Sequence, residues 1–246
     1  MMKLRILGET GPYPAPGGAT TGYLLSTDEG HVLIDCGSAV VAELTKHIKI
    51  RDLNAVIITH HHADHVSDMP VLRYAVMIHR FQGMREEPLT IYANKEPAKD
   101  FGDVGLDGHV LAEPLDSATE ITLCGMKFTF ANTEHAIPCL AVSAEYKGKR
   151  FVFSGDSGPS ESLEQLAAGA DFFLCEASWL HKDKGPKEIG HLTAHEVGEM
   201  SQRLGVKNVC LTHIYPEYDR TLLKHEAEAA FGREVLMAEQ GAVFEI

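Results

Sequence analysis

Short apolar runs, separated by glycine, proline and charged residues, recur along the chain and predict β-strands. In the first part of the chain, short turns such as Asp28-Glu29-Gly30 and those at Gly125 and Gly148 join neighbouring runs, which is the pattern of β-hairpins. The strands expected there cover residues 3–7, 23–27, 31–35, 55–58, 89–93, 120–124, 126–133, 140–146 and 150–153. Meanders of strands are therefore predicted in this part of the chain.

Stretches with apolar residues at helical spacing predict helices, and these alternate with strands in the second half of the chain. Helices are expected at residues 39–48, 66–80, 96–101, 161–168, 194–204 and 219–231, and the later strands at 172–175, 208–212, 235–237 and 243–246. Ser38 and Asp64 stand where the first two helices would take their N-caps. Meanders followed by β-α-β units predict an α/β fold, a four-layered α/β/β/α sandwich of two mixed sheets with helices outside. With 246 residues and no linker or repeat, we expect one domain over residues 1–246.

The apolar run at 55–58 is followed at once by four histidines and an aspartate, in the stretch Thr59-His60-His61-His62-Ala63-Asp64-His65. So many imidazoles are not expected in a packed apolar core, so the stretch predicts a metal site. In an extended segment, His60 and His62 point the same way and His61 points elsewhere. Asp64 and His65 would serve a second metal ion from the far side of the same turn. The alternative is an incidental, solvated His-rich loop.

Three further polar residues, His135, Asp156 and His213, each follow the end of a predicted strand. Singly, each could be no more than a satisfied turn residue, and the same holds for Asp35 at the end of the strand 31–35. Together they predict that these side chains meet at one edge of the sheets. One metal ion would then be held by His60, His62 and His135, and the other by Asp64, His65 and His213. Asp156 would lie between the two.

Imidazole and carboxylate ligands favour Zn²⁺, with Mn²⁺ or Fe²⁺ as alternatives, because such ligand sets discriminate weakly among these ions. Two such ions about 4 Å apart would share a bridging water and lower its pKa toward ~7. The predicted chemistry is therefore hydrolysis by a metal-bridging hydroxide, which Asp64 would orient while it binds metal.

The order of these residues resembles the motif set of the metallo-β-lactamase superfamily across essentially the whole chain: Asp35, His60-x-His62-x-Asp64-His65, His135, Asp156 and His213. The resemblance implies the sandwich fold and a dinuclear site, and says little about substrate.

A narrower resemblance, to the ribonuclease Z-like branch and its small bacterial hydrolases, comes from Gly190-His191-Leu192-Thr193-Ala194-His195-Glu196. Thr193 and Glu196 predict a capping box, which places His191 just before a helix. The branch implies that His191 protonates the leaving group and that Glu176 orients it, although Glu176 alone could be a helix or turn cap. We expect His195, inside the helix, to lie on the surface.

The chain also departs from ribonuclease Z. No Gly- and Lys-rich insertion that could form a tRNA-gripping arm is found, and the formal net charge of −13 disfavours a polyanionic partner. A small ester or phosphodiester is therefore the expected substrate. Five scattered cysteines, a first stretch unlike a signal peptide and no long apolar run predict a cytoplasmic protein with reduced thiols and no membrane segment. Relatives often dimerise, so a homodimer is an option.

The sequence thus predicts a dinuclear zinc hydrolase, most simply a phosphodiesterase. A carboxylester, lactone or thioester hydrolase is the main alternative, because the same hydroxide can attack an acyl carbon. A di-iron redox or sensing protein is a remote alternative, since di-iron relatives tend to carry Glu where this chain has His62.

Overall fold

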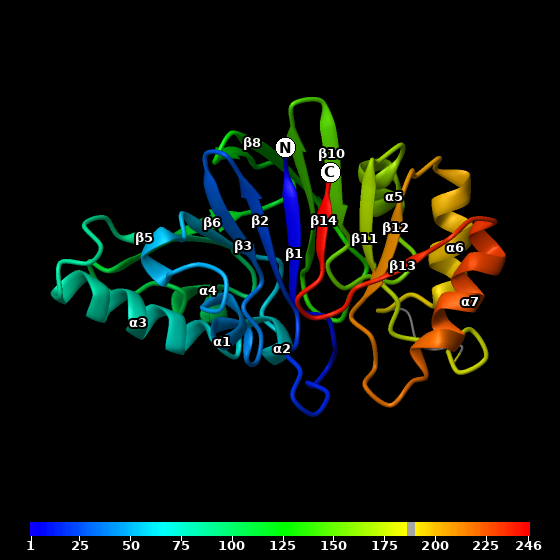
Figure 1. Ribbon diagram of the computed structural model, residues 1–246, viewed down its shortest axis with the longest axis horizontal. Helices are drawn as coiled ribbons and strands as arrows, with labels where there is room; N and C mark the ends of the chain where they lie inside the picture. Colours follow the sequence, from blue (N-terminus) through cyan, green and yellow to red (C-terminus); the bar gives the residue numbers. More distant parts are fainter. Residues whose placement is uncertain (186–189) are drawn as a thin grey trace.

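The protein folds into two β-sheets of seven strands each, packed face to face. The computed structural model describes residues 1–185 and 190–246. Figure 1 shows the two sheets side by side, with helices α1–α4 beyond one of them and α5–α7 beyond the other. The predicted four-layered sandwich of mixed sheets is therefore confirmed.

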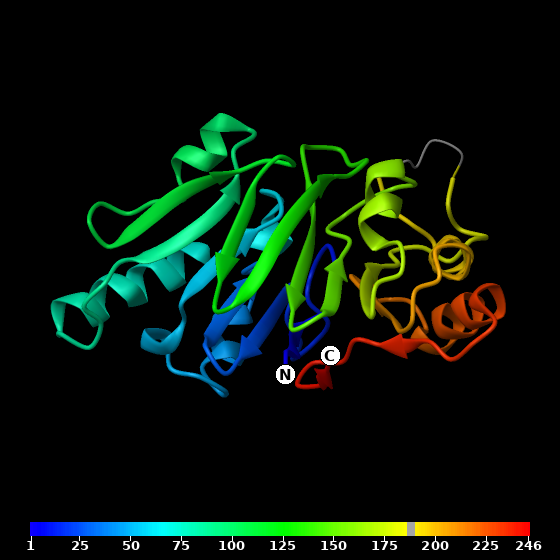
Figure 2. The same cartoon turned by 90° about the horizontal axis from the view of Figure 1, so that it is seen from above.

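The first sheet combines an antiparallel half with a parallel half. Across the sheet its strands are β14 (Val243–Glu245), β1 (Lys3–Gly8), β2 (Gly22–Thr27), β3 (Gly30–Ile34), β4 (Ala55–Ile58), β5 (Leu89–Asn94) and β6 (Val110–Leu115). Because β1 pairs antiparallel with β14, the two chain ends lie close together, as Figure 2 shows.

The second sheet is mixed in the same way, with antiparallel pairs up to β10 and parallel pairs from there on. Its strands are β7 (Glu120–Leu123), β8 (Met126–Asn132), β9 (Leu140–Tyr146), β10 (Lys149–Phe153), β11 (Phe172–Glu176), β12 (Val209–Thr212) and β13 (Leu236–Met237). Four of the predicted metal-binding segments begin where β4, β8, β10 and β12 end, so the sheets bring them together.

Three apolar clusters hold the layers in place. The central cluster lies between the sheets and includes Tyr23, Phe128 and Phe153, all fully buried. Each outer cluster packs helices onto the far face of one sheet. The helices are α1 (Val40–Leu44), the 3₁₀ turn η1 (Ile50–Asp52), α2 (Ala63–Val66), α3 (Met69–Phe81), α4 (Ala98–Gly102), α5 (Glu161–Ala167), α6 (Ala194–Arg203) and α7 (Arg220–Phe231). Within the described residues, none is long and apolar enough to cross a membrane.

Two predicted helix caps were wrong. The helix α1 begins after Ala39, whose φ of 67° is left-handed, and Ser38 donates its backbone N–H to Thr20 instead of capping. Asp64 lies inside α2, because its carboxylate is engaged with His213 at 3.0 Å. The long helix predicted at 66–80 is divided, since Asp68 accepts a hydrogen bond from Val41 and starts α3 separately.

The capping box was predicted correctly, with Thr193 and Glu196 bonded reciprocally at the start of α6. The strand β6 was not predicted, because its sequence, Val110–Leu115, contains a proline and a glutamate that obscure any strand pattern. It forms an edge of the first sheet, a position that tolerates such residues.

Gly198 provides a test of the packing between α6 and α7. A Cβ at this position would lie 2.4 Å from the backbone oxygen of Ala227, so Gly198→Ala should destabilise the protein by about 1–3 kcal/mol despite alanine's better helix propensity. Chemical denaturation measures the change. Gly102→Ala is the matched control, because nothing lies within 4 Å of the added methyl group. Equal stability of the two variants would contradict this packing.

Candidate metal centre

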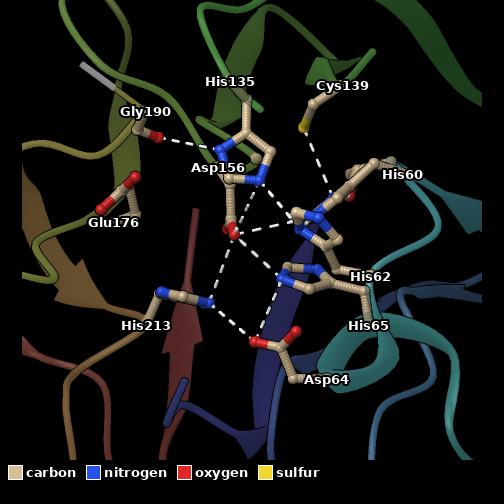
Figure 3. A network of polar contacts seen from close by, with 12 residues as sticks. His60, His62, Asp64, His65, His135, Cys139, Asp156, Glu176, Gly190 and His213 are labelled. Carbon is tan, nitrogen blue, oxygen red and sulfur yellow. Dashed lines mark hydrogen bonds and ion pairs between the residues drawn. The ribbon is translucent and has the colours of Figure 1, made fainter. Parts of the chain in front are cut away.

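All seven predicted ligand side chains meet at the end of the two sheets where β4, β8, β10 and β12 finish. Figure 3 shows them converging on one small volume. They are His60, His62, Asp64, His65, His135, Asp156 and His213. Their convergence follows from strand topology, because the strand ends of both sheets are adjacent here.

The first group consists of His60, His62, His135 and Asp156, whose ligand atoms lie within 4.8 Å of one another. The Nδ1 atom of His62 lies 3.2 Å from Nε2 of His60 and 3.0 Å from Nε2 of His135. Asp156 Oδ2 is 3.6 Å from Nε2 of His60. Three imidazole nitrogens and one carboxylate oxygen therefore face one point.

The second group consists of Asp64, His65 and His213. The Oδ2 atom of Asp64 lies 3.0 Å from Nε2 of His213 and 3.8 Å from Nε2 of His65. Asp156 also contacts this group, with its Oδ1 atom 3.3 Å from His65 Nε2 and its Oδ2 atom 3.4 Å from His213 Nε2. Asp156 is thus within reach of both groups, which is the arrangement expected of a bridging carboxylate.

Two atoms of the cluster show that it suits divalent ions. His65 Nε2 and Asp156 Oδ1 are buried and lie 3.3 Å apart, yet neither makes a well-aligned hydrogen bond in the described part of the chain, although buried polar atoms are normally satisfied. The donor set of imidazole nitrogens and carboxylate oxygens matches the preferences of zinc and similar metals. The residues therefore fit a metal centre.

The electrostatics point the same way. Burial lowers the pKa of His60 and of His62, so both imidazoles are held neutral, the form that binds metal. Burial alone would raise the pKa of Asp156, but His213 and His65 outweigh it and lower that pKa well below its ordinary value. Conversely, Asp156 and Asp35 raise the pKa of His65 against the effect of burial. The buried carboxylates thus require positive charge beside them.

Some of the ligand rings are oriented by a partner behind them. His65 Nδ1 lies 2.8 Å from Asp35, which also accepts hydrogen bonds from the backbone and hydroxyl of Thr59. His135 Nδ1 donates to the Gly190 carbonyl at 2.9 Å, as Figure 3 shows. Such partners fix which ring nitrogen faces the metal. Asp35, which the sequence left as either a turn residue or part of the site, therefore orients His65.

Two residues of this centre have a strained backbone. Asp35 and His213 have φ values of 57° and 53°, in a left-handed region that non-glycine residues rarely adopt. Gly11 approaches so closely that a Cβ there would lie 2.1 Å from His213 Nε2. Gly11 is therefore required for the loop to pass over His213, a requirement that sequence analysis missed because it depends on a contact distant in sequence.

His191 and Glu176 form a hydrogen-bonded pair beside the second group. His191 Nδ1 lies 2.8 Å from Oε1 of Glu176, which is fully buried at the end of β11. Ser178 was missed by sequence analysis and links this pair to the ligands. Its hydroxyl donates to Glu176 Oε2 at 2.8 Å and lies 2.9 Å from Nδ1 of His213.

Three other residues that the sequence singled out do not belong to the two ligand groups. His61 contacts the Asn94 carbonyl at 2.8 Å and lines a separate cavity of ≈ 200 Å³, as the extended-strand argument predicted. Cys139 is buried 3.5 Å from His60 Nδ1. His195 lies on α6 with its side chain 36% exposed, paired with Glu199.

A cavity of ≈ 640 Å³ opens beside the ligands. Its lining combines ligands, the proposed proton donor and a set of uncharged residues: His62, Asp64, Asp156, His213, His191, Gly11, Pro12, Ala63, Ser178, Trp179 and Tyr215. A small substrate can therefore reach both ligand groups and His191 at the same time.

Comparison with known proteins agrees with this geometry. Residues 31–214 match the family model of the beta-lactamase superfamily domain. The chain is 29% identical to the probable metallo-hydrolase YhfI of Bacillus subtilis over 99% of its length and 100% of the relative. The crystal structure of YhfI superposes with a TM-score of 0.96 and covers 100% of this chain and 99% of that one. Ribonuclease Z of Agathobacter rectalis is 25% identical over 89% of this chain and 90% of its own.

The relatives include a probable metallo-hydrolase, and the His/Asp cluster suits divalent metal ions, so these findings support a hydrolase. The chain belongs to the beta-lactamase superfamily, within the ribonuclease Z-like branch of its metallo-β-lactamase members.

Proposed function

We propose that the protein is a hydrolase with two Zn²⁺ ions, or Mn²⁺ or Fe²⁺ in their place, that cleaves a small phosphodiester. His60, His62 and His135 would hold one ion, Asp64, His65 and His213 the other, and Asp156 would contact both. The observation that carries the proposal is the His191–Glu176 pair, 2.8 Å apart, at the edge of the cavity beside the ligands. A leaving alkoxide needs a proton, and His191, oriented by Glu176, would donate it.

When bound, the metal ions would supply Lewis acidity and a water of lowered pKa at neutral pH. The chain's own residues would orient the attacking water and supply the proton for the leaving group. Asp64 lines the cavity and would orient the attacking water by accepting a hydrogen bond from it. As the water oxygen bonds to phosphorus and the bond to the leaving oxygen breaks, the leaving oxygen must gain a proton.

The His191 ring is oriented for that transfer. Glu176 engages Nδ1, so Nε2 is the ring atom that would give its proton to the leaving oxygen. Glu176 also accepts hydrogen bonds from the backbone N–H groups of Ser157 and Ser178, which hold its carboxylate in place. A carboxylate fixed in this way holds the His191 ring in one orientation and determines which ring nitrogen can act on the substrate.

A carboxylester, lactone or thioester hydrolase remains the second candidate. None of the described residues lining the cavity is lysine or arginine, and an uncharged ester has no need of either. A phosphodiester has a single negative charge, which the metal ions themselves would meet. Hydrolysis of a carboxylester with a good leaving group can proceed without a proton donor. The presence of a proton donor such as His191 therefore favours a phosphodiester as the substrate.

Metal removal tests the proposed centre. The purified protein should contain about two metal ions per chain and hydrolyse bis(4-nitrophenyl) phosphate with a higher kcat/KM than 4-nitrophenyl acetate. Chelation should abolish the activity and added zinc should restore it. Cleavage of the acetate alone would overturn the substrate class, and bound iron without hydrolysis would favour the di-iron alternative.

Substitution of His191 tests the proton donor. On a phosphodiester with a poor, alkoxide leaving group, His191→Gln should lower kcat by about 10²–10⁴-fold, the usual contribution of general acid catalysis, while metal content stays unchanged. Steady-state kinetics and elemental analysis on the same sample measure both. His195→Gln is the matched control, because this histidine lies on α6 and is paired with Glu199. Unchanged turnover in His191→Gln would exclude the role.

A further inference from the structure

One part of the cavity takes no part in the proposed chemistry, although it lies beside the residues that do. Trp179 and Tyr215 line the same ≈ 640 Å³ space as His191 and His213. Both residues are partly exposed, whereas the residue just before each of them, Ser178 and Ile214, is buried. Large aromatic surfaces left open next to reacting groups require an explanation, since their burial is favourable.

Trp179 is fixed in position by its backbone. Its N–H donates to the Leu192 carbonyl at 3.3 Å, and its own carbonyl accepts from Ala194 at 3.0 Å. These bonds tie Trp179 to the segment that follows His191. The indole Nε1 is buried and has no hydrogen-bond partner among the described residues, so the exposed part of the ring is carbon. The ring therefore offers the cavity an apolar face.

Tyr215 is held by two other tyrosines. Its ring packs edge-to-face against Tyr13, with centroids 5.9 Å apart and planes at 84°, and against Tyr218 at 5.5 Å and 74°. The Tyr13 hydroxyl in turn donates to Glu217 at 2.9 Å. Held from two sides, Tyr215 would lose little conformational freedom when a ligand packs against it.

The charges around the cavity show what kind of ligand suits it. Within the described residues, the charged side chains of the lining are the carboxylates of Asp64 and Asp156 and the imidazoles near them, with no lysine or arginine. Of the groups at the cavity, only the metal ions that these ligands would hold could therefore attract an anionic group. The remainder of the substrate meets Trp179, Tyr215 and Pro12, which favours an apolar, flat group over a second phosphate.

We propose that Trp179 and Tyr215 form an aromatic subsite that binds a planar aromatic or heteroaromatic group carried by the ester substrate. This inference rests on the proposed hydrolase function, because the subsite is defined relative to the reacting group. The subsite determines specificity and takes no part in the chemical step.

The chain contains a single tryptophan, so its intrinsic tryptophan fluorescence reports on Trp179 alone. Zinc-loaded protein is titrated with phenylphosphonate and with methylphosphonate, which share a head group and resist hydrolysis. Phenylphosphonate should bind about 10- to 100-fold more tightly, as expected for burial of a phenyl ring, and should change the Trp179 emission. Competition against hydrolysis of a chromogenic phosphodiester gives the same affinities independently.

Substitutions then locate the preference. Tyr215→Leu should reduce the preference for the phenyl compound about 3- to 10-fold and leave methylphosphonate binding unchanged. Trp179→Leu should act in the same direction in the competition assay. Tyr74→Leu is the control, because Tyr74 lies on α3, is 61% exposed and does not line the cavity.

The outcomes separate the two proposals. Equal affinity for both phosphonates, or a phenyl preference that survives Tyr215→Leu and Trp179→Leu, would overturn the subsite even if phosphodiesters are hydrolysed. A Tyr215-dependent phenyl preference in a protein that cleaves only carboxylesters would support the subsite and overturn the proposed phosphodiesterase function.

Discussion

The buried carboxylate of Asp156 is the interaction on which the rest of the site depends. It is 2% exposed and lies within 4 Å of four imidazoles, those of His60, His65, His135 and His213. A buried charge is tolerated only when opposite charge compensates it. The two neighbouring histidines with raised pKa, His65 and His213, supply part of that compensation with protons, which divalent ions can replace.

The fold makes this arrangement possible by ending strands of both sheets at one place. The central apolar cluster fixes the two sheets against each other, so the ligands after β4 in the first sheet meet those after β8, β10 and β12 in the second. The local strain at Asp35 and His213 is maintained by this rigid surrounding. Stability and function are therefore linked: the same packing that stabilises the sandwich brings the ligands of the two sheets together.

Much of this could be predicted from the sequence. The strands, the sandwich and the placement of all seven ligand candidates follow from apolar runs that end in histidine or aspartate, a local signal. What was missed at the site depends on contacts between distant segments. Ser178 joins Glu176 to His213, and Gly11 must be small because His213 packs on it, yet neither shows any motif. Asp64 was misjudged as a cap for the same reason, since its partner His213 lies on another sheet.

The central claim is that two metal ions are divided between the two ligand groups, with Asp156 contacting both. Anomalous diffraction from zinc-loaded crystals, recorded above and below the zinc absorption edge, tests it most directly. The account predicts two peaks, one enclosed by His60, His62 and His135 and the other by Asp64, His65 and His213. A single peak, or peaks bound by residues outside these groups, would contradict it.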